Sequence, residues 1–259
     1  LLEVGSGYTP GTPIAVADGI AVSFGEGALQ ASRVQSASGP FALRAQQPVP
    51  IADMHSHYGM ISRGKMIDSG LAEDMRRQRV VLVAWKHVAD GRWIRATAAG
   101  IEQSGVPAPG DLAALFNARF GWMRAYVAEH KLRLVLAPSD VDACLAGEPG
   151  IVLASEGADF LEGKVENLEA AYVKGLRHVQ LVHYIRTPVG DFQTVAPVHN
   201  GLSEMGRRLI EACNAKGILV DLAHSALPSV GQALEIAKAP LVWSQGWVEG
   251  DGGHWQDPR

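Results

Sequence analysis

From residue 51 onward, short apolar runs alternate with amphipathic segments along the chain. The runs are nearly continuous in apolar and β-branched residues, a pattern typical of parallel strands that are covered on both faces. Six such runs are predicted to be strands, at residues 51–55, 80–85, 151–155, 178–184, 218–224 and 240–244. A seventh stretch, residues 132–137, fits an accessory strand as well as it fits a strand of the main series.

The segments between the later runs carry helix signals at their ends. The segment from Gly163 to Gly175 places apolar residues on one stripe and stops at a glycine, the residue that most readily takes the left-handed conformation after a helix. In the next segment, Ser203 is the predicted N-cap and Gly217 the residue just past the helix. Pro240 cannot continue a helix, so the apolar run that follows it is predicted to begin as a strand.

Regular alternation of strand and helix indicates an α/β domain with right-handed crossovers, and the repeat length favours a (β/α)8 barrel of the TIM type. About six βα units fit into residues 51–259. We therefore expect a barrel that is C-terminally incomplete, either a fragment of a longer enzyme or the partner of a second chain. Residues 1–50 are rich in Gly, Ser, Ala and Pro and are predicted to form a small strand-and-turn segment without chemistry.

Composition and charge exclude several classes of protein. With 259 residues and 47% apolar composition, the chain resembles an ordinary globular protein with a sizeable core. A net charge of −4 without a basic stripe argues against nucleic acid as a partner. No apolar run approaches the roughly 18 residues that a membrane-spanning helix needs. The chain begins at Leu1, so a cytoplasmic location and export with a removed signal both stay open.

Polar side chains stand at the ends of five of the six runs. They are His55 and His57, Glu156, His183, His224 and Gln245. In a barrel, the carboxyl ends of the strands meet at one mouth, where functional residues lie. Two histidines at positions i and i+2 of a strand share a face and can converge on one ion, and neutral imidazole is a good ligand for Zn²⁺. The pattern predicts a metal site at the mouth, although an isolated buried histidine can also be a hydrogen-bonded core residue.

The motifs DMHSH, ASEGADFLEG, GLRHVQLVHY, GLSEMGRRLIEACNAKGILVDLAHSA and APLVWSQGW follow one another across roughly residues 51 to 247. In this order they resemble the membrane (renal-type) dipeptidase family of zinc peptidases, which belongs to the amidohydrolase superfamily. The resemblance implies a (β/α)8 barrel whose mouth holds two zinc ions bridged by a glutamate. It also implies hydrolysis of dipeptides by a metal-bound hydroxide.

Carried over position by position, the resemblance implies a role for each residue. His55 and His57 take the place of the first-strand metal pair. Glu156 takes that of the bridging carboxylate, and His224 that of a ligand of the second metal. His183 falls where the family has a catalytic histidine that binds the substrate and stabilises the oxyanion.

Three positions depart from the family pattern. His57 stands where the family usually has an aspartate, although other amidohydrolases use a His-x-His pair. Gln245 stands where the family has a zinc-binding histidine. An amide oxygen is a poor zinc ligand beside an imidazole, so we expect a weakened second position and one zinc ion as an alternative to two. The family's acid/base aspartate is expected beyond residue 259, and Arg259 is the one arginine that follows the sixth run and could bind the substrate carboxylate.

Three functions therefore stay open. The first is a zinc dipeptidase. The second is a mononuclear amidohydrolase that acts on another amide or on a lactone, and Gln245 favours it. The third is a catalytically impaired barrel or fragment that only binds a ligand. In each case the expected partner is a small molecule, and association into a homo-oligomer is left open.

Overall fold

The computed structural model describes residues 20–25, 28–33, 50–58, 70–98 and 100–246. The chain divides into two compact units, Leu1–Val49 and Pro50–Arg259. In the first unit, β1 (Ile20–Gly25) pairs antiparallel with β2 (Ala28–Arg33). The second unit contains the predicted sheet and all of the polar residues described above, so the rest of the description concerns it.

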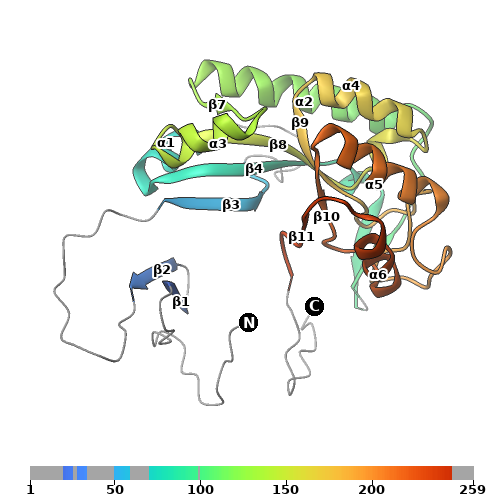
Figure 1. Cartoon of the computed structure of the whole chain (residues 1–259). Helices are drawn as coiled ribbons and strands as arrows, with labels where there is room; N and C mark the ends of the chain where they lie inside the picture. Colours follow the sequence, from blue (N-terminus) through green and yellow to red (C-terminus); the bar gives the residue numbers. More distant parts are fainter. Residues whose placement is uncertain (1–19, 26–27, 34–49, 59–69, 99, 247–259) are drawn as a thin grey trace, which may run out of the picture. The chain divides into compact units, whose positions relative to one another are not determined.

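The second unit is built on a sheet in which neighbouring strands follow the order of the chain. Six parallel strands form the path of this sheet, and a short seventh, β7 (Arg133–Leu134), pairs with β8 beside it. The six are β3 (Ile51–Ser56), β4 (Val80–Val88), β8 (Gly150–Glu156), β9 (Leu176–Gln180), β10 (Leu219–Asp221) and β11 (Leu241–Val242). Figure 1 shows the sheet curling from β3 to β11, as in part of a barrel. The predicted barrel-type α/β fold is thereby confirmed.

Helices fill the connections between the strands and pack on the outer side of the curled sheet (Figure 1). They are α1 (Leu71–Gln78), α2 (Asp111–Glu129), α3 (Pro138–Leu145), α4 (Leu168–Val173), α5 (Glu204–Lys216) and α6 (Leu227–Ile236). A small antiparallel pair, β5 (Ile94–Thr97) and β6 (Gly100–Gln103), and three 3-10 turns, at Asp90–Arg92, Asp159–Leu161 and Val165–Asn167, complete the unit.

The predicted ends of α5 are confirmed in detail. The Ser203 hydroxyl accepts a hydrogen bond from the backbone N–H of Gly206, the capping contact that satisfies one of the free donors of a helix start. Gly217 follows the helix with φ +66°, the left-handed conformation that glycine adopts without a steric cost.

The last three predicted strands are shorter in the structure. The fourth run was expected to be a strand to residue 184, but β9 ends at Gln180. Just past this end, the Gln180 side-chain amide donates to the backbone carbonyl of Val182, and the Leu181 N–H still donates to the carbonyl of Asp221. The fifth and sixth runs, predicted at residues 218–224 and 240–244, are likewise shortened to β10 at Leu219–Asp221 and β11 at Leu241–Val242.

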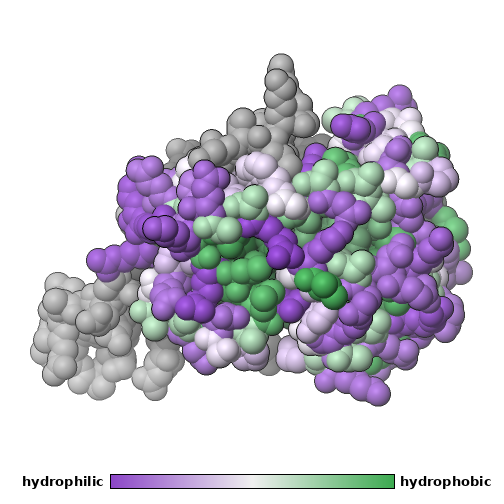
Figure 2. Space-filling view, turned by 90° about the horizontal axis from the view of Figure 1, so that it is seen from above, coloured by the Kyte–Doolittle hydropathy of each residue, from purple (hydrophilic) through white to green (hydrophobic). Residues whose placement is uncertain are grey.

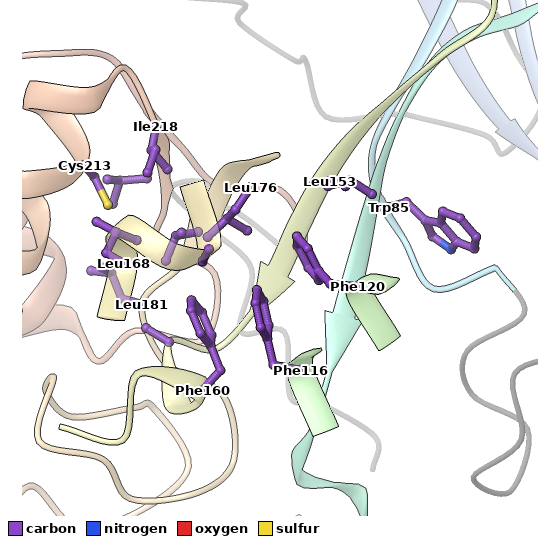
Figure 3. Close-up of a cluster of buried hydrophobic side chains, with 14 of the residues drawn as sticks. Trp85, Phe116, Phe120, Leu153, Phe160, Leu168, Leu176, Leu181, Cys213 and Ile218 are labelled. Atoms are coloured by element: carbon purple, nitrogen blue, oxygen red, sulfur yellow. The ribbon is translucent and has the colours of Figure 1, made fainter. Parts of the chain in front are cut away.

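The core lies between the sheet and the helices on its outer side. Figure 3 shows Phe116 and Phe120 of α2 beside Phe160, with Leu153 of β8 and Trp85 of β4 close to them. The Phe116 ring stacks on Phe120 and on Phe160, with 4.1 Å between ring centroids in both cases. All five side chains are buried, so this aromatic cluster fixes α2 against the strands that carry the polar residues.

The face that carries α2 and α4 is mostly polar. Figure 2 views the molecule from the side on which α2 and α4 lie in Figure 1, and hydrophilic residues cover most of that face around a central apolar area. Among the residues that the structure describes, no helix combines the length and the apolar character that crossing a membrane would require.

Candidate metal centre

The structure brings the predicted polar residues together at the carboxyl ends of the strands. His55 and His57 lie at the end of β3, and Glu156 is the last residue of β8. Three further side chains each lie three residues beyond the end of their own strand, namely His183 after β9, His224 after β10 and Gln245 after β11. The other predicted substrate-binding residue, Arg259, lies outside the described part of the chain.

The first group consists of His55, His57 and Glu156. The Nε2 atoms of the two histidines lie 3.0 Å apart. Glu156 Oε1 lies 3.3 Å from Nε2 of His55, and Glu156 Oε2 lies 2.8 Å from Nε2 of His57. The Glu156 side chain is 3% exposed, so its charge needs a compensating cation or strong donors. Two imidazoles and one carboxylate that meet in this way form a plausible ligand set for a metal ion.

The hydrogen bond at Nδ1 of His57 indicates which nitrogen of this ring carries the proton. His57 Nδ1 lies 3.2 Å from the backbone carbonyl of Lys86, and a carbonyl can only accept. Nδ1 therefore carries the proton, and in the neutral ring Nε2 presents its lone pair to Nε2 of His55 and to Glu156. A lone pair that faces a carboxylate at this distance is repelled unless a proton or a metal ion lies between them. The donor set and its protonation therefore fit a bound cation.

The second group shares Glu156 with the first. Glu156 Oε1 lies 3.3 Å from Nε2 of His183 and 3.4 Å from Nε2 of His224. The three side chains are close enough to one another to hold an ion. The amide nitrogen of Gln245 contacts both His224 Nε2 and Glu156 Oε1, the latter at 2.8 Å. Gln245 can therefore satisfy His224 Nε2 and Glu156 Oε1 by hydrogen bonds, without a metal ion.

Two residues just after the strand ends have a positive φ. His224 has φ +65°, which is uncommon for a residue other than glycine. Gly157, which follows Glu156, has φ +91°, and a Cβ there would lie 2.7 Å from Asp159 Oδ1 and 3.4 Å from His183 Cβ. Glycine is therefore required at the turn that brings β8 past the second group.

The electrostatics of the centre favour an ionised Glu156. Burial alone would raise the pKa of this carboxyl, but the surrounding imidazoles of His224, His55 and His57 outweigh burial and hold the pKa well below its usual range. For His55, burial dominates and lowers the pKa, which favours the neutral ring that a metal requires. For His183, burial alone would lower the pKa, but the bond to Asp90 and the charge of Glu156 raise it.

Sequence reasoning missed Asp90, which orients His183. Its carboxylate lies 2.6 Å from His183 Nδ1 and accepts a hydrogen bond from the backbone N–H of Tyr184 at 3.1 Å. This contact directs Nε2 of His183 toward Glu156. The one available signal was position, because Asp90 follows the end of β4 as the predicted ligands follow theirs.

Asp159 lies buried in the same region and supports a prediction about pH. Burial and the negative charge of Asp90 raise the pKa of Asp159 from 3.8 to about 7. Between about pH 4 and about pH 7, the folded protein therefore holds a proton on Asp159 that the unfolded chain has lost. The contribution of this residue to the free energy of unfolding is complete below about pH 4 and is lost as the pH rises to about 7. The expected slope is about 1.4 kcal/mol per pH unit. We expect Asp159→Asn to remove this dependence, so that the variant gains stability relative to the wild type from pH 4 to pH 7.

Urea unfolding of the metal-free chain at several pH values measures this effect. Asp142→Asn, which changes an exposed aspartate of α3, is the matched control and should follow the wild type at every pH. A difference between Asp159→Asn and the wild type that stays constant with pH would show that Asp159 is ionised in the folded protein.

Comparisons with known proteins place this geometry in context. Residues 113–249, more than half of the chain, match the family described as membrane dipeptidase, peptidase family M19. The chain is similar to dipeptidase tcpJ of Claviceps purpurea, with 31% identity over 100 residues that cover 38% of this chain and 24% of the relative. It is also similar to dipeptidase verJ of Clonostachys rogersoniana, with 24% identity over 221 residues that cover 78% of this chain and 56% of the relative.

A solved structure has the same fold. It is described as the dipeptidase AC, a metallopeptidase of family M19, and it superposes with a TM-score of 0.60 at 19% identity. The match covers 74% of this chain and 62% of that structure. The chain thus spans between a quarter and about two thirds of the length of these three relatives.

Proposed function

The chain belongs to the membrane dipeptidase family, peptidase family M19, and from this premise we propose that it hydrolyses dipeptides with the help of a divalent metal ion, zinc being the expected one. His55, His57 and Glu156 would hold the first ion. The observation that carries the proposal is the convergence of both Nε2 atoms, which lie 3.0 Å apart, on one buried carboxylate.

A bound zinc ion would supply a nucleophile at neutral pH, since it lowers the pKa of water from about 15.7 to about 7. The residues of the chain supply position and charge. Glu156 directs Oε1 toward His55 and toward the second group, and Oε2 toward His57, and with its lowered pKa the carboxylate stays ionised. Its place between the two groups supports the role of a shared ligand.

His183 is proposed to bind the carbonyl oxygen of the substrate. Asp90 fixes the ring through Nδ1, which leaves Nε2 on the side of Glu156 and within the polar centre. The raised pKa of His183 favours a protonated ring, which donates a hydrogen bond and cannot ligate a metal through Nε2. A preorganised donor to a developing oxyanion typically contributes about 3 to 4 kcal/mol to catalysis.

Gln245 favours a second candidate function. Its amide already satisfies His224 and Glu156, and an amide is a poor zinc ligand, so the second ion would be held weakly or not at all. A mononuclear enzyme of this kind could act on another amide or on a lactone. Metal content separates the two candidates: about two ions per chain support the dinuclear dipeptidase, and about one supports the mononuclear enzyme.

Hydrolysis of a small dipeptide panel tests the proposed function. We expect turnover that is lost on treatment with a chelator and restored by Zn²⁺. His55→Ala should abolish this turnover because it removes one of the first ligands. His199→Ala, which changes an exposed histidine in the loop after β9, is the control and should retain activity. Turnover that persists in His55→Ala, or that survives the chelator, would refute a metal-dependent mechanism at this site.

A further inference from the structure

A buried polar cluster lies directly behind the histidine pair. Its central cation is Lys86 of β4, a charged residue within an apolar strand, and its side chain is fully buried. Lys86 Nζ forms an ion pair with Asp221, the last residue of β10, and both side chains are 0% exposed. Nζ also donates to Gln180 Oε1 at 3.0 Å and to Ser244 Oγ at 3.1 Å.

Asp221 accepts hydrogen bonds from several directions. Its Oδ1 accepts from the backbone N–H groups of Ala223 and Ser244, at 3.0 Å and 3.1 Å. Its Oδ2 contacts Lys86 Nζ, the Ser244 hydroxyl and, at 3.1 Å, His178 Nε2. Although burial alone would raise the pKa of this carboxyl, the bond to His178 and the charge of Lys86 lower it. Asp221 is therefore an ionised group that can only accept.

Ser244 connects this cluster to the metal centre. Its Oγ lies 2.7 Å from Nδ1 of His55. A serine hydroxyl has one proton to donate and two lone pairs with which to accept. The proton goes to Asp221, which cannot donate, and one lone pair receives the proton of Lys86, which cannot accept. The remaining lone pair faces His55, so His55 must donate from Nδ1.

The proton on Nδ1 of His55 determines the state of Nε2, the other nitrogen of the ring. When Nδ1 of His55 carries the proton, Nε2 of the neutral ring presents a lone pair toward Glu156 and His57. The backbone of the same lysine acts on the second histidine, because the Lys86 carbonyl accepts from Nδ1 of His57. Both rings are thus held in the form that a metal ion requires, His57 by the Lys86 carbonyl and His55 by Ser244, which accepts from Lys86 Nζ.

We propose that Lys86, Asp221 and Ser244 are positioning residues that hold His55 in the Nδ1–H tautomer and aim its Nε2 into the metal centre. The consequence for metal affinity rests on the proposed function, whereas the tautomer is a property of the metal-free chain. A purely structural role would require only that Lys86 and Asp221 join β4 to β10. It would not require the Ser244 hydroxyl, whose three partners match its hydrogen-bonding capacity and include the metal-site ring.

The test compares Ser244→Ala with Ser244→Thr, which keeps the hydroxyl. Ser229→Ala is the matched control, because Ser229 is also a buried serine but bonds to the carbonyl of Asp191 in the α6 region. The first readout is the tautomer of His55 in the metal-free chain, measured by long-range ¹H–¹⁵N correlation NMR with ¹⁵N-labelled histidine and assigned with His55→Ala. The second is the affinity for Zn²⁺, measured by titration calorimetry.

The expected result is an Nδ1–H tautomer in the wild type, in Ser244→Thr and in Ser229→Ala, and a mixture of tautomers in Ser244→Ala. Loss of a partner of this kind typically costs about 10- to 100-fold in metal affinity, and we expect that loss for Ser244→Ala alone. The proposal is overturned if Ser244→Ala keeps both the tautomer and the affinity of the control. If the wild type binds no Zn²⁺, the proposed function fails, but the tautomer comparison still decides whether the cluster positions His55.

Discussion

Glu156→Gln is expected to abolish metal binding and dipeptide hydrolysis together. The glutamate is the one side chain that belongs to both groups of prospective ligands, with one oxygen toward His55, His183 and His224 and the other toward His57. Glutamine has the same shape but no charge, so the change removes the anion and leaves the packing in place. Because a metal ion contributes several kcal/mol to catalysis, we expect kcat/KM to fall by at least about 1,000-fold.

Metal analysis and dipeptide turnover measure this effect side by side. Glu211→Gln, which changes an exposed glutamate on α5, is the control and should retain both properties. The folded state of the variant is checked by its thermal unfolding, which should show a cooperative transition. A folded Glu156→Gln chain that binds the metal as tightly as the wild type would show that the carboxylate is not a ligand.

Gln245→His is expected to have the largest effect in the opposite direction. The amide lies against His224 and Glu156, so an imidazole at this position would add a second nitrogen ligand next to His224. We expect the metal content to rise from about one to about two ions per chain, because imidazole is the better zinc ligand. We expect the affinity for the second ion to rise by at least about tenfold, which corresponds to about 1.4 kcal/mol of binding free energy.

Metal stoichiometry by elemental analysis, together with turnover, measures this gain. His224→Ala in the Gln245→His background should return the content to about one ion, which shows that the new ligand acts with His224. If Gln245→His leaves both metal content and activity unchanged, the position of Gln245 in the second group has been misinterpreted.

The sequence was sufficient to predict the fold and the place where the polar residues meet. Continuous apolar runs ending in histidine or glutamate are a strong signal, because the carboxyl ends of parallel strands meet at the same edge of a sheet. His55, His57, Glu156 and His224 were therefore identifiable without coordinates. Their distances to one another agree with the predicted grouping, while their roles as metal ligands stay predictions.

The residues that support the centre could not be predicted from the sequence. Lys86 stands within an apolar strand, where nothing in the pattern distinguishes a charged residue that points outward from one that pairs inside the barrel. Its partner Asp221 lies 135 residues away in the chain. Asp90 likewise reaches His183 over 93 residues. Contacts of this kind depend on the register between distant strands, which periodicity along one segment does not reveal.

The central claim is that His55, His57 and Glu156 together bind one metal ion. The most direct test is a crystal structure of the chain with Zn²⁺, recorded at the zinc absorption edge so that the ion is located by its anomalous signal. The account predicts a peak about 2.0 to 2.1 Å from Nε2 of both histidines and about 2.0 to 2.2 Å from an oxygen of Glu156. An anomalous peak elsewhere, or none at this position at saturating zinc, would contradict it.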